Sequence, residues 1–244
     1  MGTSLSYGDC TMVTTLYLIR HGVPEGSGTR RYTGSIDIPL SEKGAEQIRR
    51  ASVLIVKHLL ASASVQTHNY LRDIHGLSAP RPDPGNHDTT LHAVYCSDLS
   101  RALKSAEIIA EPHGVKTVAV EDLRERNFGI WEGMTFTEIR DRYPEEFQSW
   151  ADNPLKFSPM GGESTIEVRD RTVPAVQDIM NKHRGEQIAI VAHGGVNRIV
   201  LCHVMGIPLE NIFRLEQDHG AVNIIEFWDR YPVVKLLNGM RDAE

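Results

Sequence analysis

Two stretches of the chain decide its fold: residues 15–22 (TLYLIRHG) and residues 187–195 (QIAIVAHGG). Each begins as a short apolar run rich in β-branched or aromatic residues, which is typical of a buried strand. Each run ends at a histidine that is followed by glycine, so we expect a loop or turn directly after the strand. The pattern therefore predicts two buried strands that each present an imidazole at the carboxyl end.

Other strands and helices are expected to alternate along the chain. The middle strands are near-continuous apolar runs, which favours an α/β three-layer sandwich with a mostly parallel central sheet and helices on both faces. Ser41 is the expected N-cap of the first helix. Further strands are predicted at 93–96 and 117–120, helices at 100–111, 136–143, 164–182 and 196–205, a loop at 154–162, and a final hairpin of 221–227 with 233–237.

The chain is expected to form a single domain over residues 13–244, preceded by a flexible leader at 1–12. Residues 62–91 interrupt the regular pattern. They carry Pro80, Pro82 and Pro84 in alternation, which disfavours both helix and sheet. We interpret this segment as an inserted surface loop.

Composition excludes several classes of protein. With 41% hydrophobic and 24% charged residues over 244 positions, the chain has globular composition. A net charge of −6 disfavours general binding to nucleic acid or an anionic membrane, and no apolar run approaches the ~20 residues of a membrane span. No signal peptide is visible, and three widely spaced cysteines fit neither a paired disulfide framework nor a metal motif. We therefore expect a cytoplasmic protein.

The two histidines, His21 and His193, are candidates for one shared site. Ligands of open α/β sheets bind beyond the carboxyl ends of the strands, so both imidazoles are expected in the same crevice. Arg20 precedes His21 directly. An adjacent cation disfavours a metal, whereas a guanidinium group suits phosphate oxygens and a neutral imidazole can attack phosphorus. This chemistry points to phosphoryl transfer without a metal site.

Four sequence motifs, in the same order along the chain, resemble those of the histidine phosphatase superfamily, also called the phosphoglycerate mutase-like family. They are RHG at 20–22, SDLSRA at 97–102, LRERNFG at 123–129 and AHG at 192–194. The resemblance covers about residues 14–228 and breaks at the insertion. Within the family it is nearest to the phosphatase branch that includes α-ribazole phosphatases.

The resemblance implies a role for each matching residue. His21 resembles the nucleophile that becomes a phosphohistidine, and Arg20 and Arg101 resemble the arginines that grip the phosphoryl group. His193 resembles the second histidine that binds the same group. Glu125 resembles the residue that protonates the leaving oxygen and later activates water. Positioned positive charge and a proton donor are what in-line phosphoryl transfer requires.

Three further residues are candidates for substrate binding. Where the family often has an asparagine that touches the phosphate, this chain has Ser27, whose hydroxyl could serve instead. Arg31 stands where the family often has a basic residue, and Gly194 follows the second histidine. The resemblance implies neither a cofactor nor a metal.

The sequence favours a phosphatase over a mutase. Residues 128–133 and 160–164 resemble the phosphatase form, and the substrate loop of the glycolytic mutases is not recognisable. We therefore expect a metal-independent phosphomonoester hydrolase that acts on a small phosphorylated metabolite. Two alternatives stay open at this point: a cofactor-dependent phosphoglycerate mutase, and a non-catalytic protein that binds a phosphorylated ligand. A homodimer is a candidate assembly, because dimers are common in the family.

Overall fold

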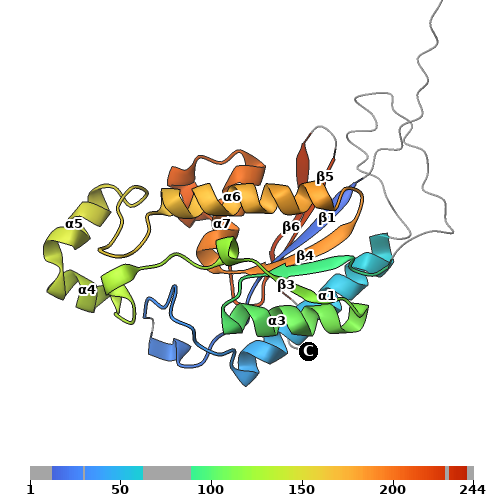
Figure 1. Cartoon of the computed structure of the whole chain (residues 1–244), viewed down its shortest axis with the longest axis horizontal. Coiled ribbons are helices and arrows are strands. Elements are labelled where there is room, and N and C mark those ends of the chain that lie inside the picture. The colour runs from blue at the N-terminus through green and yellow to red at the C-terminus, as the bar shows by residue number, and fades with distance from the viewer. Residues whose placement is uncertain (1–12, 30, 63–88, 229–230, 241–244) are drawn as a thin grey trace, which may run out of the picture.

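The fold is built around a six-stranded mixed sheet (Figure 1). The computed structural model describes residues 13–29, 31–62, 89–228 and 231–240; the leader and nearly all of the 62–91 segment lie outside these ranges. The strand order is β3-β2-β4-β1-β5-β6. The strands are β1 (Thr14–Arg20), β2 (Ala93–Cys96), β3 (Thr117–Ala119), β4 (Gln187–Ala192), β5 (Val222–Phe227) and β6 (Pro232–Gly239).

Strands β3, β2, β4 and β1 run parallel, and β5 and β6 add an antiparallel edge. Helices cover both faces: α1 (Glu42–Ser62) and α3 (Ser100–Ala110) on one, α6 (Thr165–Lys182) and α7 (Gly194–Met205) on the other (Figure 1). The predicted three-layer α/β sandwich is therefore confirmed. None of the described helices is long and apolar enough to cross a membrane.

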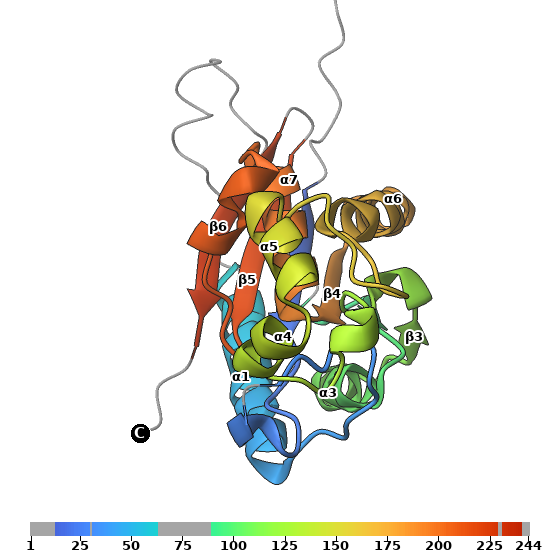
Figure 2. The same ribbon diagram turned by 90° about the vertical axis from the view of Figure 1, so that its left-hand side faces the viewer.

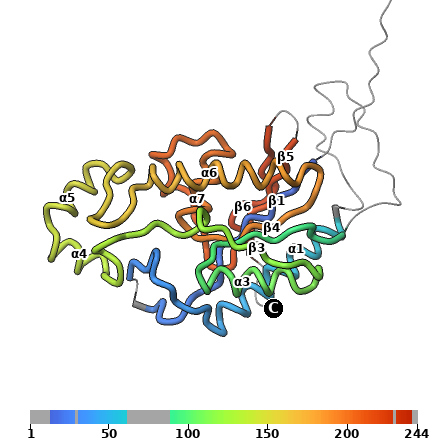
Figure 3. The backbone as a smooth tube through the Cα atoms, viewed as in Figure 1, coloured from blue at the N-terminus to red at the C-terminus, as the bar shows by residue number. Residues whose placement is uncertain are grey.

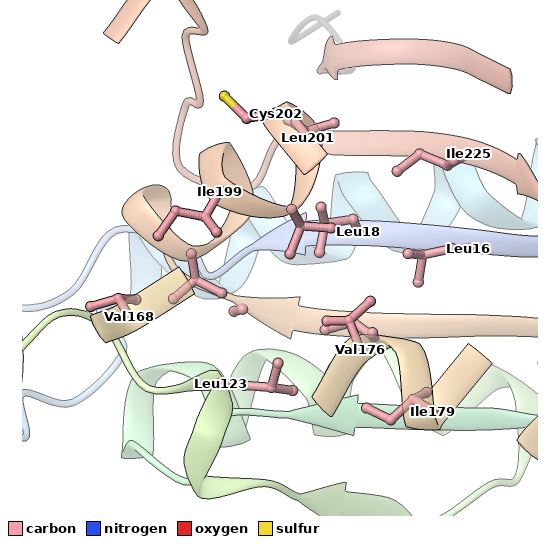
Figure 4. Close-up of a cluster of buried hydrophobic side chains, with 14 of the residues drawn as sticks. Leu16, Leu18, Leu123, Val168, Val176, Ile179, Ile199, Leu201, Cys202 and Ile225 are labelled. Carbon is pink, nitrogen blue, oxygen red and sulfur yellow. The ribbon is translucent and has the colours of Figure 1, made fainter. Parts of the chain in front are cut away.

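Each face of the sheet has its own apolar core. Figure 4 shows Leu16 and Leu18 of β1 pointing into the core that lies beneath α6 and α7. On the opposite face, Tyr17 and Ile19 of the same strand pack against α1 and α3. Strand β1 is thus buried on both sides, which explains why its sequence is a continuous apolar run rather than an alternating one.

Two helix starts agree with the sequence pattern. The Ser41 hydroxyl accepts a hydrogen bond from the Gly44 backbone N–H at 3.0 Å and so caps α1. Ser164 and Glu167 form a reciprocal capping box at the start of α6. Helix α7 begins two residues earlier than expected, at Gly194 rather than Val196.

A helical excursion lies beyond the end of the sheet. The chain leaves β3, forms α4 (Phe136–Arg142) and α5 (Pro144–Asp152), and returns to α6, a path that Figure 3 traces. Figure 2 shows α4 and α5 lying across that end of the molecule. Helix α5 was not predicted. The 3-10 turns η1 (Ser27–Thr29), η2 (Glu111–His113), η3 (Glu121–Leu123), η4 (Gly129–Trp131) and η5 (Leu209–Arg214) complete the connections.

Candidate active site

The parallel pairing of β1 with β4 brings His21 and His193 together. Arg20 pairs with Ala192 in register, so the residue after each strand lies at the same sheet edge. The His21 backbone N–H donates to the Ala192 carbonyl at 3.0 Å, and the two imidazole centroids are 4.9 Å apart. The two histidines therefore lie side by side, as the sequence pattern predicts.

A backbone hydrogen bond orients the His21 ring. Nδ1 lies 2.7 Å from the Gly22 carbonyl oxygen. A carbonyl only accepts, so Nδ1 must carry the hydrogen and Nε2 must carry the free lone pair. Burial lowers the pKa of His21 well below its usual value, and the charge of Arg101 lowers it further. The ring is therefore neutral at physiological pH, with a nucleophilic Nε2.

His193 faces the same space with unused polar atoms. It is the N-cap residue of α7 and is completely buried. Neither ring nitrogen has a hydrogen-bond partner within the described part of the chain. Burial, together with the charges of Arg101 and Arg20, keeps the pKa of His193 well below its usual range. Buried unpaired polar atoms are costly, so this ring is poised to bind an incoming polar group.

Two arginines flank the histidines: Arg20, which is half-buried, and Arg101, which is buried. Arg20 donates from Nη1 to the Gln217 carbonyl at 2.6 Å, while its buried Nε has no acceptor among the described residues. Arg101, in the first turn of α3, is only 3% exposed and donates to the carbonyls of Ile36 and Gly34. Neither makes an ion pair with a carboxylate in the described structure, so both guanidinium charges are available to an anion.

Two backbone N–H groups hold the Glu125 carboxylate. Oε1 accepts from Arg126 at 2.9 Å, and Oε2 accepts from Gly195 at the start of α7 at 3.0 Å. A Cβ atom at position 195 would lie 2.5 Å from Glu125 Oε1, and one at position 194 would lie 3.3 Å from the Arg20 guanidinium carbon. The glycine pair therefore lets both groups approach the helix terminus closely.

An ion pair behind the site fixes the segment that carries Glu125. Arg171 of α6 donates to Glu163 at 2.8 Å and to the carbonyls of Asp122 and Glu125 at 2.7 and 3.3 Å. Arg126 donates to the Glu163 carbonyl at 2.6 Å. The 122–126 segment is thus tied to α6 by hydrogen bonds that leave the Glu125 carboxylate directed toward α7.

Ser27 and Arg31 lie in more exposed positions than the other candidates. Ser27 is exposed in η1. Arg31 donates at 2.7 Å to both the Gly133 carbonyl and Glu138, a residue whose carboxylate also helps to cap α4. These contacts give Arg31 a structural partner, and its role in substrate binding, like that of Ser27, stays a prediction.

The sequence reasoning missed His219. Its Nε2 lies 3.1 Å from Arg20 Nη2, and its Nδ1 lies 3.3 Å from the His21 carbonyl oxygen. A guanidinium group can only donate, so His219 Nε2 accepts from Arg20. A carbonyl can only accept, so His219 Nδ1 donates to His21. Burial and then the Arg20 charge lower the pKa of His219 to about 4. The only sequence signal is a following glycine, which His75 and His113 also have, so it could not single this residue out.

Most of the chain matches one known protein family. The family model for the histidine phosphatase superfamily (branch 1) matches residues 16–65 and 86–239. Phosphoserine phosphatase 1 of Hydrogenobacter thermophilus is 26% identical over 223 residues, 91% of each chain. The metal-independent phosphoserine phosphatase of Arabidopsis thaliana is 30% identical, covering 79% of this chain and 69% of that protein.

Solved structures share the fold of this chain. Bacillus stearothermophilus YhfR is 30% identical with a TM-score of 0.72, covering 94% of this chain and 98% of that one. The α-ribazole phosphatase of Shigella flexneri has a TM-score of 0.73 at 22% identity, covering 94% and 99%. The chain belongs to the histidine phosphatase superfamily, and its predicted function as a phosphatase of small phosphorylated molecules is confirmed.

Proposed function

We propose that the chain hydrolyses phosphomonoesters through a phosphohistidine on His21 and without a metal ion. The observation that carries this proposal is the neutral His21 Nε2, which is free of hydrogen and surrounded by Arg20, Arg101 and His193. The guanidinium groups of Arg20 and Arg101 supply the positive charge that phosphoryl transfer requires. The charge of a metal ion is therefore not needed in the mechanism.

In the first half-reaction, the lone pair of His21 Nε2 attacks phosphorus and forms an N–P bond. The ester P–O bond breaks, and its electron pair leaves with the alcohol oxygen. Glu125 gives that oxygen a proton, so the alcohol departs neutral. Arg20, Arg101 and His193 bind the equatorial phosphoryl oxygens.

In the second half-reaction, the Glu125 carboxylate takes a proton from water. The water oxygen attacks phosphorus, the N–P bond breaks, and its electron pair returns to His21 Nε2. Inorganic phosphate leaves, and the proton taken from water replaces the one that Glu125 gave to the alcohol. One ester and one water thus give one alcohol and one phosphate, with the protein unchanged.

An assay of phosphate release tests this proposal. We expect the chain to release phosphate from p-nitrophenyl phosphate in the presence of a chelator and without a primer. Phosphoserine is the first metabolite to test, because it is in the names of two relatives. Conversion of 3-phosphoglycerate to 2-phosphoglycerate that depends on 2,3-bisphosphoglycerate would instead make the chain a mutase. Affinity for phosphate esters without turnover would make it a binding protein.

We also propose a cellular location and an oligomeric state for the protein. Cytoplasmic location is supported by Cys96 and Cys202, which are buried free thiols, and burial raises the pKa of Cys96 to about 12. A homodimer is supported by the family resemblance alone. Cell fractionation and light scattering measure the two properties.

We predict that His219 positions Arg20. His219→Ala removes the acceptor of Arg20 Nη2, and we expect kcat/KM to fall about 10- to 100-fold, because small displacements of a phosphate-binding group are costly. His219→Gln keeps one acceptor and one donor and should recover part of the loss. His203→Ala, which changes an exposed histidine of α7, is the control. Full activity of His219→Ala would show that Arg20 needs no such support.

Folding stability should depend on pH through the same residue. The pKa of His219 is about 4 in the folded protein against 6.5 for an unperturbed histidine, so the unfolded state binds more protons between these values. The contribution of His219 to the free energy of unfolding is therefore complete above pH 6.5 and is lost as the pH falls toward 4. Between pH 7 and 5 we expect His219 to contribute ~2 kcal/mol of this loss. Urea unfolding of wild type and His219→Gln at both pH values measures it; equal losses in the two proteins would contradict the prediction.

A further inference from the structure

A mostly apolar cavity of about 220 Å³ adjoins Glu125. Its lining residues come from α4 and α5 on one side and from α6 and α7 on the other, with Glu125 and Gly195 in the wall. Most of the remaining wall is aromatic or aliphatic, and it includes Trp131, Phe136, Ile139, Phe147, Trp150 and Phe213. Because Glu125 is the proposed proton donor to the leaving oxygen, this cavity lies on the leaving-group side of the site.

The outer wall of the cavity is unusually exposed for its residue types. Phe213 is 65% exposed and Phe136 is 46% exposed, whereas Ile139 and Trp131 at the inner wall are 1% and 3% exposed. Phe136 packs edge-on against Phe147 at 4.9 Å, so the rim is a preformed aromatic surface. A ligand ring inserted between rim and inner wall would remove apolar surface from water on both sides.

The two arginines in the wall are engaged with the protein. Arg126 donates to the Glu163 and Phe157 carbonyls and lies over the Phe128 ring at 5.3 Å. Arg198 donates to the Leu215 carbonyl at 2.6 Å and to Glu216 at 3.3 Å. These bonds direct guanidinium donors away from a ligand, so the cavity suits a ring better than a carboxylate.

We propose that this cavity binds the alcohol part of the substrate and selects phosphomonoesters whose alcohol carries one aromatic ring or an apolar group of similar size. The inference rests on the proposed function of the site. A cavity of about 150 Å³ holds benzene, so about 220 Å³ accommodates one ring with a short linker. Small polar alcohols such as serine would leave the aromatic wall in contact with water.

The test compares ethyl phosphate with 2-phenylethyl phosphate. The two alcohols have similar acidity, so the P–O bonds of the two esters should be equally easy to break. A difference in kcat/KM between the esters therefore reports on binding in the cavity. We expect kcat/KM to be at least about 10-fold higher for the phenylethyl ester, and higher than for phosphoserine. In Phe136→Ala/Phe213→Ala the ratio of the two kcat/KM values should fall roughly tenfold. Leu60→Ala, which removes an exposed apolar side chain of α1, should keep the wild-type ratio.

The outcomes separate this inference from the proposed function. Phosphate release from both esters with equal kcat/KM, or preference for phosphoserine, would overturn the cavity assignment and leave the phosphatase mechanism intact. No phosphate release from any ester would overturn the proposed function itself. An unchanged ratio in the double variant, with thermal unfolding like wild type, would show that the ring binds elsewhere.

Discussion

His21→Ala should lose at least about 10⁴-fold in kcat on every phosphomonoester, because the variant has no nitrogen to attack phosphorus. It should also form no phosphoenzyme. The side chain is buried, and among the described residues its hydrogen bond is to the neighbouring Gly22 carbonyl, so its removal should leave the sheet and both cores intact. Steady-state phosphate release, with circular dichroism as a check of folding, measures the effect.

His203→Ala is the matched control for this prediction. It removes an imidazole from α7, the helix that His193 precedes, but from an exposed position. Its turnover should equal that of wild type. A loss in His21→Ala well below about 10⁴-fold would mean that another group attacks phosphorus.

Glu125→Gln should lower kcat about 10²- to 10⁴-fold while phosphate still binds, because general acid and base catalysis is removed and the arginines are kept. The loss should be larger for alkyl esters than for p-nitrophenyl phosphate, whose leaving group needs no proton. With p-nitrophenyl phosphate the slow step becomes water attack, so a burst of one p-nitrophenolate per chain is expected. Rapid mixing measures the burst.

Glu121→Gln provides the control for the acid–base variant. Its carboxylate is 76% exposed and pairs with Arg124 rather than with the site. Because glutamine can accept only one of the two backbone N–H groups that hold Glu125, thermal unfolding should accompany the kinetics. Unchanged turnover in a folded Glu125→Gln protein would remove this residue from the mechanism.

The sheet could be predicted from sequence because burial on both faces makes β1 and β4 continuous apolar runs. In a parallel sheet the residues that follow these two strands lie at the same edge. The proximity of His21 and His193 could therefore also be predicted from the sequence. Helix α5 was not predicted. Its Pro144 stands in the first turn, where proline is tolerated, and none of its residues is fully buried, so it lacks a core-facing pattern.

The finer parts of the site depend on contacts between segments far apart in sequence. The predicted start of α7 was two residues late because glycine disfavours a helix. In the structure, Gly194 and Gly195 leave room for Arg20 and Glu125 to approach the start of the helix closely. His219 acts on a residue 199 positions away, and no local pattern reports such a contact. The aromatic cavity likewise joins residues from α4, α5, η4 and η5, which sequence order separates.

Trapping the phosphoenzyme shows whether His21 is the nucleophile. Wild-type chain is mixed with a phosphomonoester, quenched in alkali within milliseconds and digested for mass spectrometry at neutral pH. We expect one acid-labile, alkali-stable phosphoryl group per chain, located on the peptide that contains His21. In Glu125→Gln this phosphoenzyme should accumulate. Rapid phosphate release with no phosphoenzyme, or a phosphoryl group on another residue, would contradict the role of His21 as the nucleophile.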